Sequence, residues 1–512
     1  MTQECNLRKH PIVWCISASD SGGGAGMQAD VHTVEDLGCH ACSVVTAVTA
    51  QNSLGVTSVE AVSNAILLAQ LDTLLSDMRP VAIKIGLIAD QAQLNCLAGW
   101  LTQHLSGVPI VLDPVLCATT GHDFNRTELD FGPLLTLIQV FTPNAFEVGQ
   151  LCGTACSTFS QFIDALPALQ QMTPAHLLLK GGDLAEPEWA DDLLFLRQPP
   201  FCAEQHLNRG FKLRSLRIAT KHNHGSGCTL SSAIAALIAQ QWVIPDAIVI
   251  AKAYVHSGLQ NGYPIGYGAG VIAKSGFPKN VAHFPHVLPL QEAKAICRNS
   301  LSAFQFASKV YPIVSNLEQL ALLLQCGCRT LQLRMKATDE GLLDTTIKQA
   351  VALAKRYQTQ LFINDHWQLA LKYQAYGVHL GQEDFLRADL DALKTAGIVL
   401  GLSSHSYFEA LIALEQQPDY LALGHIFPTT TKVMPSQPQG LSRLMHYGAT
   451  FAPALATVAI GGINAQNLND IQDCGVQAAA IVSAVIHAND PALAYLTLAR
   501  QWQSETDVEG IV

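Results

Sequence analysis

Charged residues are scarce in this chain of 512 residues, and no long run of them carries one sign. Asp, Glu, Lys and Arg make up 14% of the sequence, against 49% hydrophobic residues, and the formal net charge is −11. Without a basic stretch, neither a nucleic acid nor a membrane surface is expected as a partner. The large apolar fraction also excludes extended disorder, because it can build a core.

Long hydrophobic runs are absent as well. No stretch of about 18 apolar residues lacks a polar break, and the first residues show no signal-peptide pattern. The fourteen cysteines are scattered through apolar runs, which is typical of free thiols in an intracellular chain. We therefore expect a soluble, cytoplasmic protein with two or three domains.

Two nucleotide-binding patterns are missing. The sequence has no GxxxxGK[ST] and no convincing GxGxxG with an acidic partner downstream, so neither a P-loop nor a dinucleotide fold is predicted. Instead, the first half alternates short apolar runs with helical patterns, which indicates parallel βαβ units and an α/β fold. The predicted strands are 12–17, 42–48, 82–87, 109–113, 140–144, 176–182 and 192–196.

The second half repeats one unit more regularly. Eight apolar runs end at polar residues, at 311–316, 330–336, 361–365, 377–384, 398–404, 420–425, 457–463 and 478–484. Eight strand–helix units fit a (β/α)₈ barrel, whose active site forms at the carboxyl ends of its strands. A proline- and histidine-rich stretch separates the halves. We predict a first domain over residues 1–280, a linker over 281–306 and a second domain over 307–512.

The segment HGSGCT (224–229) opens a helical pattern with a Gly-Ser-Gly turn. Backbone N–H groups at a helix start bind phosphate oxygens and stabilise the charge that develops in phosphoryl transfer. The same letters also fit an ordinary helix capped by Ser226. Further Gly-rich, acidic and amide groups suited to Mg²⁺ and nucleotide phosphates stand in SDSGGGAG, DPV, TPNAFE and KGGD.

Seven segments stand in order over about residues 10–280: SASDSGGGAGMQAD, TAVTAQN, KIGL, VLDPV, TPNAFE, LLKGG and HGSGCTLSSAIAA. This series resembles the hydroxymethylpyrimidine/phosphomethylpyrimidine kinases of the ribokinase superfamily. The resemblance implies a ribokinase-like α/β sandwich with a mostly parallel sheet. It also implies that ATP phosphorylates 4-amino-5-hydroxymethyl-2-methylpyrimidine twice.

The same resemblance implies roles for residues. Gln51 would meet the aminopyrimidine edge, since an amide offers a donor and an acceptor. Cys228 would be a candidate base, standing where sugar kinases carry aspartate and where a helix N-terminus favours a thiolate, or it would only shape the pocket. The substrate side would include Asp20, Gly22, Gly23 and Val115; the ATP and Mg²⁺ side Asp113, Asn144, Glu147 and Lys180; and the anion hole Gly225, Ser226 and Gly227.

In the second half, QLRMK places Gln332, Arg334 and Lys336 on one face of a strand, because side chains alternate. Two cations and an amide at a barrel mouth suit a diphosphate, although a solvated strand end would look the same. Asp365 and Asp384 follow neighbouring strands, and two carboxylates with diphosphate oxygens are a normal Mg²⁺ environment.

The order QLRMK, FIND, GVHLGQED, GLSSH, ALGHIFPTTTK, AIGGI and VSA is similar to that of thiamine-phosphate synthases. This implies a TIM barrel that joins the pyrimidine diphosphate to 4-methyl-5-(2-phosphooxyethyl)thiazole, giving thiamine phosphate and diphosphate. It implies Mg²⁺ on Asp365 and Asp384, with Arg334 and Lys432 stabilising the departing diphosphate. The implied substrate residues are Gln332, Leu333, Arg334, Met335, Lys336, Asn364, Ser403, Thr429, Thr430, Thr431, Lys432, Gly461, Gly462, Val482 and Ser483.

Together these features predict a bifunctional enzyme of thiamine biosynthesis that uses ATP and Mg²⁺. Its partners would be small molecules only, and a homo-oligomer stays open. Two alternatives also stay open. The kinase could act on a related vitamin such as pyridoxal, or the chain could sense a thiamine precursor without turnover, which requires a dead site.

Overall fold

The structure is a computed structural model that describes residues 10–116, 129–184, 188–197, 210–290, 301–336, 339–429 and 437–506. The chain divides into two compact units. One comprises Met1–Pro278 with His283–Ala293, and the other Lys279–Ala282 with Lys294–Val512. Among the described helices, none combines the length and the apolar character that crossing a bilayer requires.

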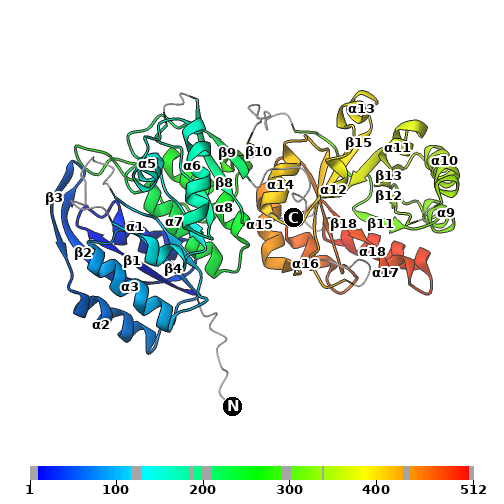
Figure 1. The fold of residues 1–512 in the computed structure, drawn as a ribbon. Helices are drawn as coiled ribbons and strands as arrows, with labels where there is room; N and C mark the ends of the chain where they lie inside the picture. Colours follow the sequence, from blue (N-terminus) through cyan, green and yellow to red (C-terminus); the bar gives the residue numbers. More distant parts are fainter. Residues whose placement is uncertain are drawn as a thin grey trace, which may run out of the picture. The chain divides into compact units, whose positions relative to one another are not determined.

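The first unit is built on one mixed sheet (Figure 1). Within the described residues its ten strands are β1 (Ile12–Asp20), β2 (His40–Asn52), β3 (Gly55–Ala61), β4 (Ala82–Ile85), β5 (Ile110–Leu112), β6 (Val140–Phe141), β7 (His176–Leu179), β8 (Trp189–Phe195), β9 (Gly210–Leu216) and β10 (His286–Pro289). Their spatial order is β10-β9-β8-β7-β6-β5-β4-β1-β2-β3. The strands from β7 to β2 run parallel, and both margins of the sheet are antiparallel.

Helices cover both faces of this sheet. They are α1 (Gly26–Asp36), α2 (Asn64–Leu75), α3 (Gln91–His104), α4 (Gly132–Leu135), α5 (Ala145–Cys152), α6 (Phe159–Met172), α7 (Ser226–Ala239) and α8 (Ile244–Gln260). Helices α1, α7 and α8 pack together, while α2, α3 and α6 contribute to a separate core around Trp14, Phe141 and Phe162. Helix α7 is buried almost all round, which explains why its sequence is apolar with small residues on every side.

The second unit is a closed barrel of parallel strands. In chain order they are β11 (Val310–Val314), β12 (Thr330–Leu333), β13 (Gln360–Asn364), β14 (Gly377–Leu380), β15 (Val399–Ser404), β16 (Tyr420–Gly424), β17 (Ala456–Ile460) and β18 (Ala478–Ile481). The described helices are α9 (Leu317–Gln325), α10 (Glu340–Arg356), α11 (Trp367–Tyr373), α12 (Gln382–Phe385), α13 (Leu390–Thr395), α14 (Tyr407–Leu414), α15 (Gly440–Phe451), α16 (Leu468–Asp473), α17 (Ser483–Ile486) and α18 (Pro491–Thr506). This confirms the predicted barrel strand by strand.

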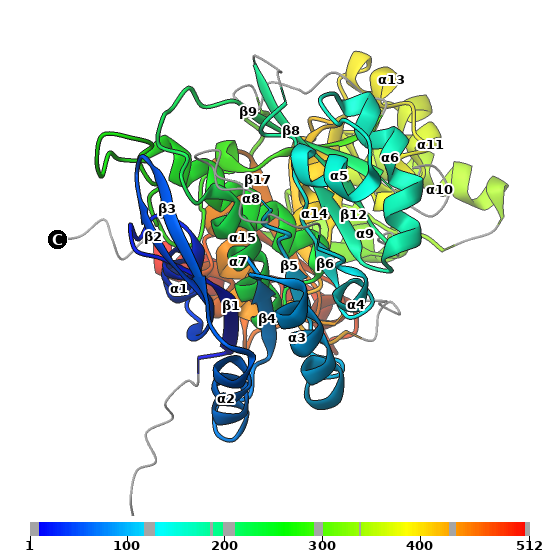
Figure 2. The ribbon, with the colours of Figure 1, turned by 60° about the vertical axis from the view of Figure 1, so that its left-hand side comes forward.

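Three strands of the first unit were not predicted: β3, β9 and β10. Strand β3 lies beside β2 as an antiparallel edge strand (Figure 2) and has mostly exposed or half-buried side chains, so no apolar run marks it. Strand β10 lies inside the stretch 281–306 that was expected to be a linker. Because Val287 and Leu288 are buried and β10 pairs with β9, the first sheet extends past residue 280, and the predicted boundary is wrong there.

An ion pair is buried in the first unit. The Lys84 ammonium on β4 donates to both carboxylate oxygens of Asp30 on α1, at 2.8 and 2.7 Å, and neither side chain is exposed. Ser232 of α7 donates to the same carboxylate at 2.7 Å. The pair therefore ties the sheet to two helices that begin at its carboxyl edge.

We expect Lys84→Met to lower the free energy of unfolding by about 3–5 kcal/mol, because it leaves the Asp30 carboxylate buried without a counter-ion. Urea unfolding followed by tryptophan fluorescence measures this. Lys372→Met is the matched control, since the ion pair of Lys372 with Asp344 is exposed, and it should change stability little. Equal effects of the two substitutions would contradict the prediction.

Candidate active sites

In the first unit, a cavity of about 640 Å³ gathers residues that lie far apart in the sequence. It brings together most of the predicted kinase residues: Asp20, Gln51, Asp113, Val115, Asn144, Glu147, Lys180, Gly225, Ser226, Gly227 and Cys228. Gly22 and Gly23 do not line it. They form the turn that follows β1.

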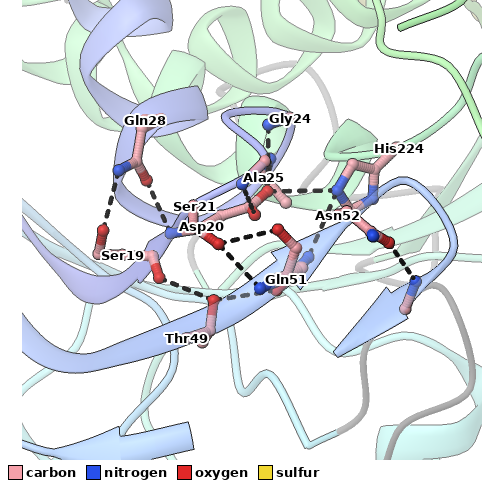
Figure 3. A network of polar contacts seen from close by, with 12 residues as sticks. Ser19, Asp20, Ser21, Gly24, Ala25, Gln28, Thr49, Gln51, Asn52 and His224 are labelled. Atoms are coloured by element: carbon pink, nitrogen blue, oxygen red, sulfur yellow. Dashed lines mark hydrogen bonds and ion pairs between the residues drawn. The ribbon is translucent and has the colours of Figure 1, made fainter. Parts of the chain in front are cut away.

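Asp20, the last residue of β1, organises this Gly-rich turn (Figure 3). Its Oδ1 accepts from the Gly22 amide at 2.8 Å, and its Oδ2 accepts from the amides of Gly24 and Ala25 at 3.0 and 2.8 Å. Burial alone raises the pKa of Asp20, but hydrogen bonds from His224, Ala25 and Gly22 outweigh it and the pKa is lowered. The carboxylate is therefore ionised and serves mainly to shape the loop.

Glycine is required where this loop meets the start of α7. A Cβ on Gly225, whose φ is +77°, would lie 2.0 Å from the Gly24 carbonyl oxygen. A Cβ on Gly24 would lie 2.4 Å from Cδ2 of His224. The two loops thus touch backbone to backbone, and no side chain fits between them.

Helix α7 begins with unpaired amides. Gly225 is its N-cap, so the expectation that Ser226 might cap the helix is wrong: no side chain bonds to this end. The Ser226 amide donates to the Asn223 carbonyl at 3.2 Å. Within the described part of the chain, the amides of Gly227 and Cys228 have no protein acceptor, and Gly227 lines the cavity. Free amides at a helix start are what an anion hole needs.

Lys180 lies beside this helix start. A Cβ on Gly227 would lie 3.5 Å from the Lys180 ammonium and 3.7 Å from an Asp113 oxygen. Lys180 donates to Asp113 at 2.6 Å and lies 3.8 Å from Glu147. Burial raises the pKa of Glu147 to about 7, with Asp113 acting in the same direction and Lys180 against it. Asn144 and Glu147 also form the capping box of α5, so both have a structural role that the sequence interpretation did not give them.

Cys228 departs from expectation. Burial raises the pKa of its thiol to about 11, with Asp30 and Asp113 acting in the same direction, although Lys84 and the Gly26 amide oppose them. The raised pKa disfavours the thiolate that a helix terminus alone would favour. Desolvation and two carboxylates outweigh the field of the helix terminus.

In the second unit, Asp365 directly after β13 lies beside Asp384 of α12, the short helix that follows β14. Burial and the neighbouring Asp384 carboxyl raise the pKa of Asp365 to about 6, while Arg334 and His366 lower it. The backbone of Asp365 has φ +65°, which turns the chain sharply after the strand. The structure thus brings together two carboxyls and one cation of the predicted site.

A chain of polar side chains crosses the barrel interior. The Gln332 amide donates to the Tyr311 hydroxyl at 3.2 Å, which lies 3.0 Å from the Tyr420 hydroxyl. Nδ1 of His379 lies 2.8 Å from Tyr420 Oη, and its Nε2 lies 2.8 Å from Ser403 Oγ. One direction of donation satisfies every link, from Gln332 to Ser403. Two predicted substrate residues are thereby connected through three residues that had no predicted role.

The other predicted synthase residues are placed as follows. Strand β12 ends at the buried Leu333, so the alternation that grouped Lys336 with Gln332 stops early, and Lys336 is exposed. Met335 is half-buried and Asn364 is buried. A Cβ on Gly461 or Gly462 would meet His425 or Phe427, so this loop needs glycine. Val482 and Ser483 stand at the start of α17, and Thr429 ends a described segment, whereas Thr430, Thr431 and Lys432 lie outside the described residues.

Comparisons with known proteins agree with this geometry. The family model of phosphomethylpyrimidine kinase matches residues 20–273, and that of thiamine monophosphate synthase matches residues 310–485. The chloroplastic thiamine biosynthetic bifunctional enzyme of Arabidopsis thaliana is 31% identical over 502 residues, covering 95% of this chain and 92% of that protein. The chain belongs to the family of bifunctional thiamine biosynthetic enzymes.

Relatives of the second half of this bifunctional enzyme also exist as separate proteins. The thiamine-phosphate synthase of Cronobacter sakazakii is 49% identical over 181 residues, or 35% of this chain and 86% of that protein. A solved phosphomethylpyrimidine kinase of Clostridium difficile is 29% identical, with a TM-score of 0.40, and covers 48% of this chain and 98% of its own. The predicted pairing of a pyrimidine kinase with a thiamine-phosphate synthase is confirmed.

Sequence reasoning overlooked several residues of the bifunctional enzyme's sites. Thr49 and His224 line the kinase cavity, and both lie inside segments whose other residues were predicted for the site. Tyr311 and Tyr420 stand within apolar strand runs, where a buried tyrosine looks like ordinary core. Only the fold shows that these hydroxyls meet.

The raised pKa of Cys228 predicts slow alkylation. At pH 7.5 iodoacetamide should modify this thiol roughly a hundredfold more slowly than the same residue in urea-unfolded protein, because the thiolate is the nucleophile. The rate should still be rising at pH 9. Mass spectrometry of the peptide that contains Cys228 measures it, and a plateau below pH 8 would show a thiolate instead.

Tyr420→Phe should lower synthase turnover and cost about 1–3 kcal/mol of stability, because the Tyr311 hydroxyl and His379 Nδ1 lose a buried partner. Kinase turnover should be unchanged. Tyr376→Phe is the control, since its hydroxyl accepts from Gln360 at an exposed position. Thermal unfolding and separate assays of both activities test this, and intact synthase turnover with Tyr420→Phe would contradict it.

Proposed function

We propose that the first unit transfers the γ-phosphoryl group of ATP to the hydroxyl oxygen of 4-amino-5-hydroxymethyl-2-methylpyrimidine, and then phosphorylates the monophosphate. In each step a new O–P bond forms, the bond from Pγ to the bridging oxygen breaks, and ADP leaves; in the first step the hydroxyl proton is released to solvent. The observation that carries this proposal is the start of α7. Its free amides at Gly227 and Cys228 lie beside the Lys180 ammonium, in a cavity that also holds Gln51.

The residues around Lys180 fit nucleotide phosphates with Mg²⁺. Asp113 and Glu147 both lie near Lys180, so two carboxyl groups share one ammonium. Hard cations prefer such carboxylate oxygens. When bound, Mg²⁺ would neutralise charge on the β- and γ-phosphates. Lys180 and the α7 amides would hold the transferring group in place, and Asn144 would keep Glu147 oriented through the capping box.

For Cys228, the raised pKa favours a role in shaping the pocket over one as a base. A loose phosphoryl-transfer transition state demands little proton removal from the attacking hydroxyl. A neutral thiol also leaves the negative charge of the cavity to the phosphates and carboxylates.

We propose that the barrel uses the pyrimidine diphosphate made by the first unit. The C–O bond at the pyrimidine methylene breaks with loss of diphosphate, and the thiazole nitrogen forms the new C–N bond. Asp365 and Asp384 fit a divalent cation, because the neighbouring Asp384 carboxyl raises the pKa of Asp365 and a bound cation would offset that repulsion. Mg²⁺ would supply positive charge for the departing diphosphate together with Arg334 and, as the resemblance implies, Lys432.

The remaining residues would orient the two substrates in the barrel. Gln332, Asn364 and Ser403 would contact the pyrimidine diphosphate, and the first and last of these are fixed by the interior chain of hydrogen bonds. The glycines at 461 and 462, with Val482 and Ser483, would receive the thiazole phosphate, as phosphate sites in barrels follow the last two strands.

Two variants separate the activities. Lys180→Ala should lower kinase kcat by about 10²–10³ and leave the synthase intact when pyrimidine diphosphate is supplied. Asp365→Asn should abolish thiamine phosphate formation while pyrimidine diphosphate accumulates from ATP and the alcohol. Phosphorus NMR follows both.

The wild type decides the proposal itself. Folded protein that forms neither a phosphorylated pyrimidine nor thiamine phosphate would refute it. Faster turnover of pyridoxal than of the hydroxymethylpyrimidine would instead favour the other vitamin kinase.

A further inference from the structure

In the kinase cavity, His224 lies near both Asp20 and Gln51 (Figure 3). It is buried, and its Nε2 lies 3.3 Å from Asp20 Oδ2 and 3.5 Å from Gln51 Nε2. Gln51 also approaches Thr49, whose Oγ1 lies 3.4 Å from Gln51 Oε1 and donates to the Ser19 carbonyl at 2.9 Å. His224 Nδ1 has no partner among the described residues.

The contacts of His224 Nε2 conflict. The Asp20 carboxylate is ionised and can only accept, so Nε2 must carry the proton. An N–H cannot also accept from the amide nitrogen of Gln51. Placing the proton on Nδ1 instead would leave two acceptors facing each other at Asp20 and would bury an unpaired N–H.

Thr49 shows the same conflict at the other end of the amide. Its hydroxyl has one hydrogen, which the Ser19 carbonyl receives at the shorter distance of 2.9 Å. The Thr49 oxygen can then only accept, yet Gln51 Oε1 faces it. The two ends of a carboxamide have the same shape, so their partners decide its orientation.

A half-turn of the Gln51 carboxamide about its Cγ–Cδ bond removes both conflicts. Its oxygen then accepts from His224 Nε2–H, and its nitrogen donates to Thr49 Oγ1. We propose that His224 is a positioning residue that, together with Thr49, fixes the carboxamide of Gln51 in this orientation. The amide then offers the cavity one acceptor on the His224 side and one donor on the Thr49 side.

This polarity sets which way the pyrimidine faces, and here the inference rests on the proposed function. The 4-amino group would donate to the oxygen on the His224 side, and ring nitrogen N3 would accept on the Thr49 side. The hydroxymethyl carbon neighbours the amino group on the ring, so it falls on the His224 side. His224 directly precedes Gly225, the N-cap of α7, so this side leads to the anion hole. The opposite amide orientation would turn the hydroxyl away from it.

The first test needs no substrate. In the full chain labelled with ¹⁵N-histidine, long-range ¹H–¹⁵N spectra report which ring nitrogen carries the proton, and the His224 signal is the one lost in His224→Gln. We expect the proton on Nε2. A proton on Nδ1 overturns the proposal, whatever substrate the enzyme uses.

The second test compares three variants in the kinase assay. His224→Leu should raise KM for the hydroxymethylpyrimidine about tenfold to a hundredfold and change KM for ATP less than about twofold. His224→Gln, which keeps an N–H donor near the Nε2 position, should recover most of the loss. His176→Leu, a half-buried histidine at the start of β7 outside the cavity, should match the wild type.

Substrate selectivity should change if His224 positions Gln51, but not if His224 only stabilises the fold. The 4-oxo analogue of the substrate has an acceptor at C4 and a donor at N3, so the fixed amide disfavours it. His224→Leu frees the amide to turn, and its preference for the 4-amino over the 4-oxo compound should fall at least about tenfold. An unchanged preference, or equal KM values for the Leu and Gln variants, overturns the proposal. A wild type inactive on both compounds refutes the proposed function, whereas a proton on His224 Nδ1 separately overturns the inference.

Discussion

The kinase site depends on a contact that only glycine permits. The Gly24 carbonyl oxygen occupies the space where a Cβ of Gly225 would stand, 2.0 Å away. This contact holds the loop after β1 against the start of α7, although about 200 residues separate them in the chain. Asp20 keeps the loop in shape through three amides, and the same carboxylate meets His224. Under the proposed function, the groups that read the pyrimidine edge and those that hold phosphate therefore line the same cavity.

In the barrel, side chains rather than a backbone contact position the residues of the site. Aromatic rings fill its interior, and Tyr420 packs against Phe304, Phe306 and Phe362. Hydroxyls inside such a core cost free energy unless they find partners. Here they find one another, and the resulting chain of hydrogen bonds leads to residues at the mouth. The same side chains thus pack the barrel core and hold residues of the synthase site in place.

Sequence patterns predicted these units to different degrees. Every barrel strand was predicted, because each apolar run ends at a polar residue on the catalytic edge. Strands β3 and β10 were missed, since an edge strand is defined by its partner more than by its own apolar residues. The raised pKa of Cys228 could not be predicted, because spacing reveals a helix terminus but not the burial and the carboxylates around it. His224 was missed as a partner of Gln51 because it comes from a separate segment, and Thr49 because only the structure shows that its hydroxyl approaches the Gln51 amide.

If one cavity catalyses both phosphorylations, it must recognise a part of the substrate that the first phosphorylation leaves unchanged. Under the proposed function, the pyrimidine edge read by Gln51 is identical in the alcohol and in the monophosphate. What changes is the reach of the acceptor oxygen toward α7. Neutral backbone amides suit this task, because they bind phosphate oxygens without demanding a fixed charge or one distance. A buried ionised thiolate at Cys228 would repel the monophosphate, so the raised pKa of its thiol removes an obstacle to the second transfer.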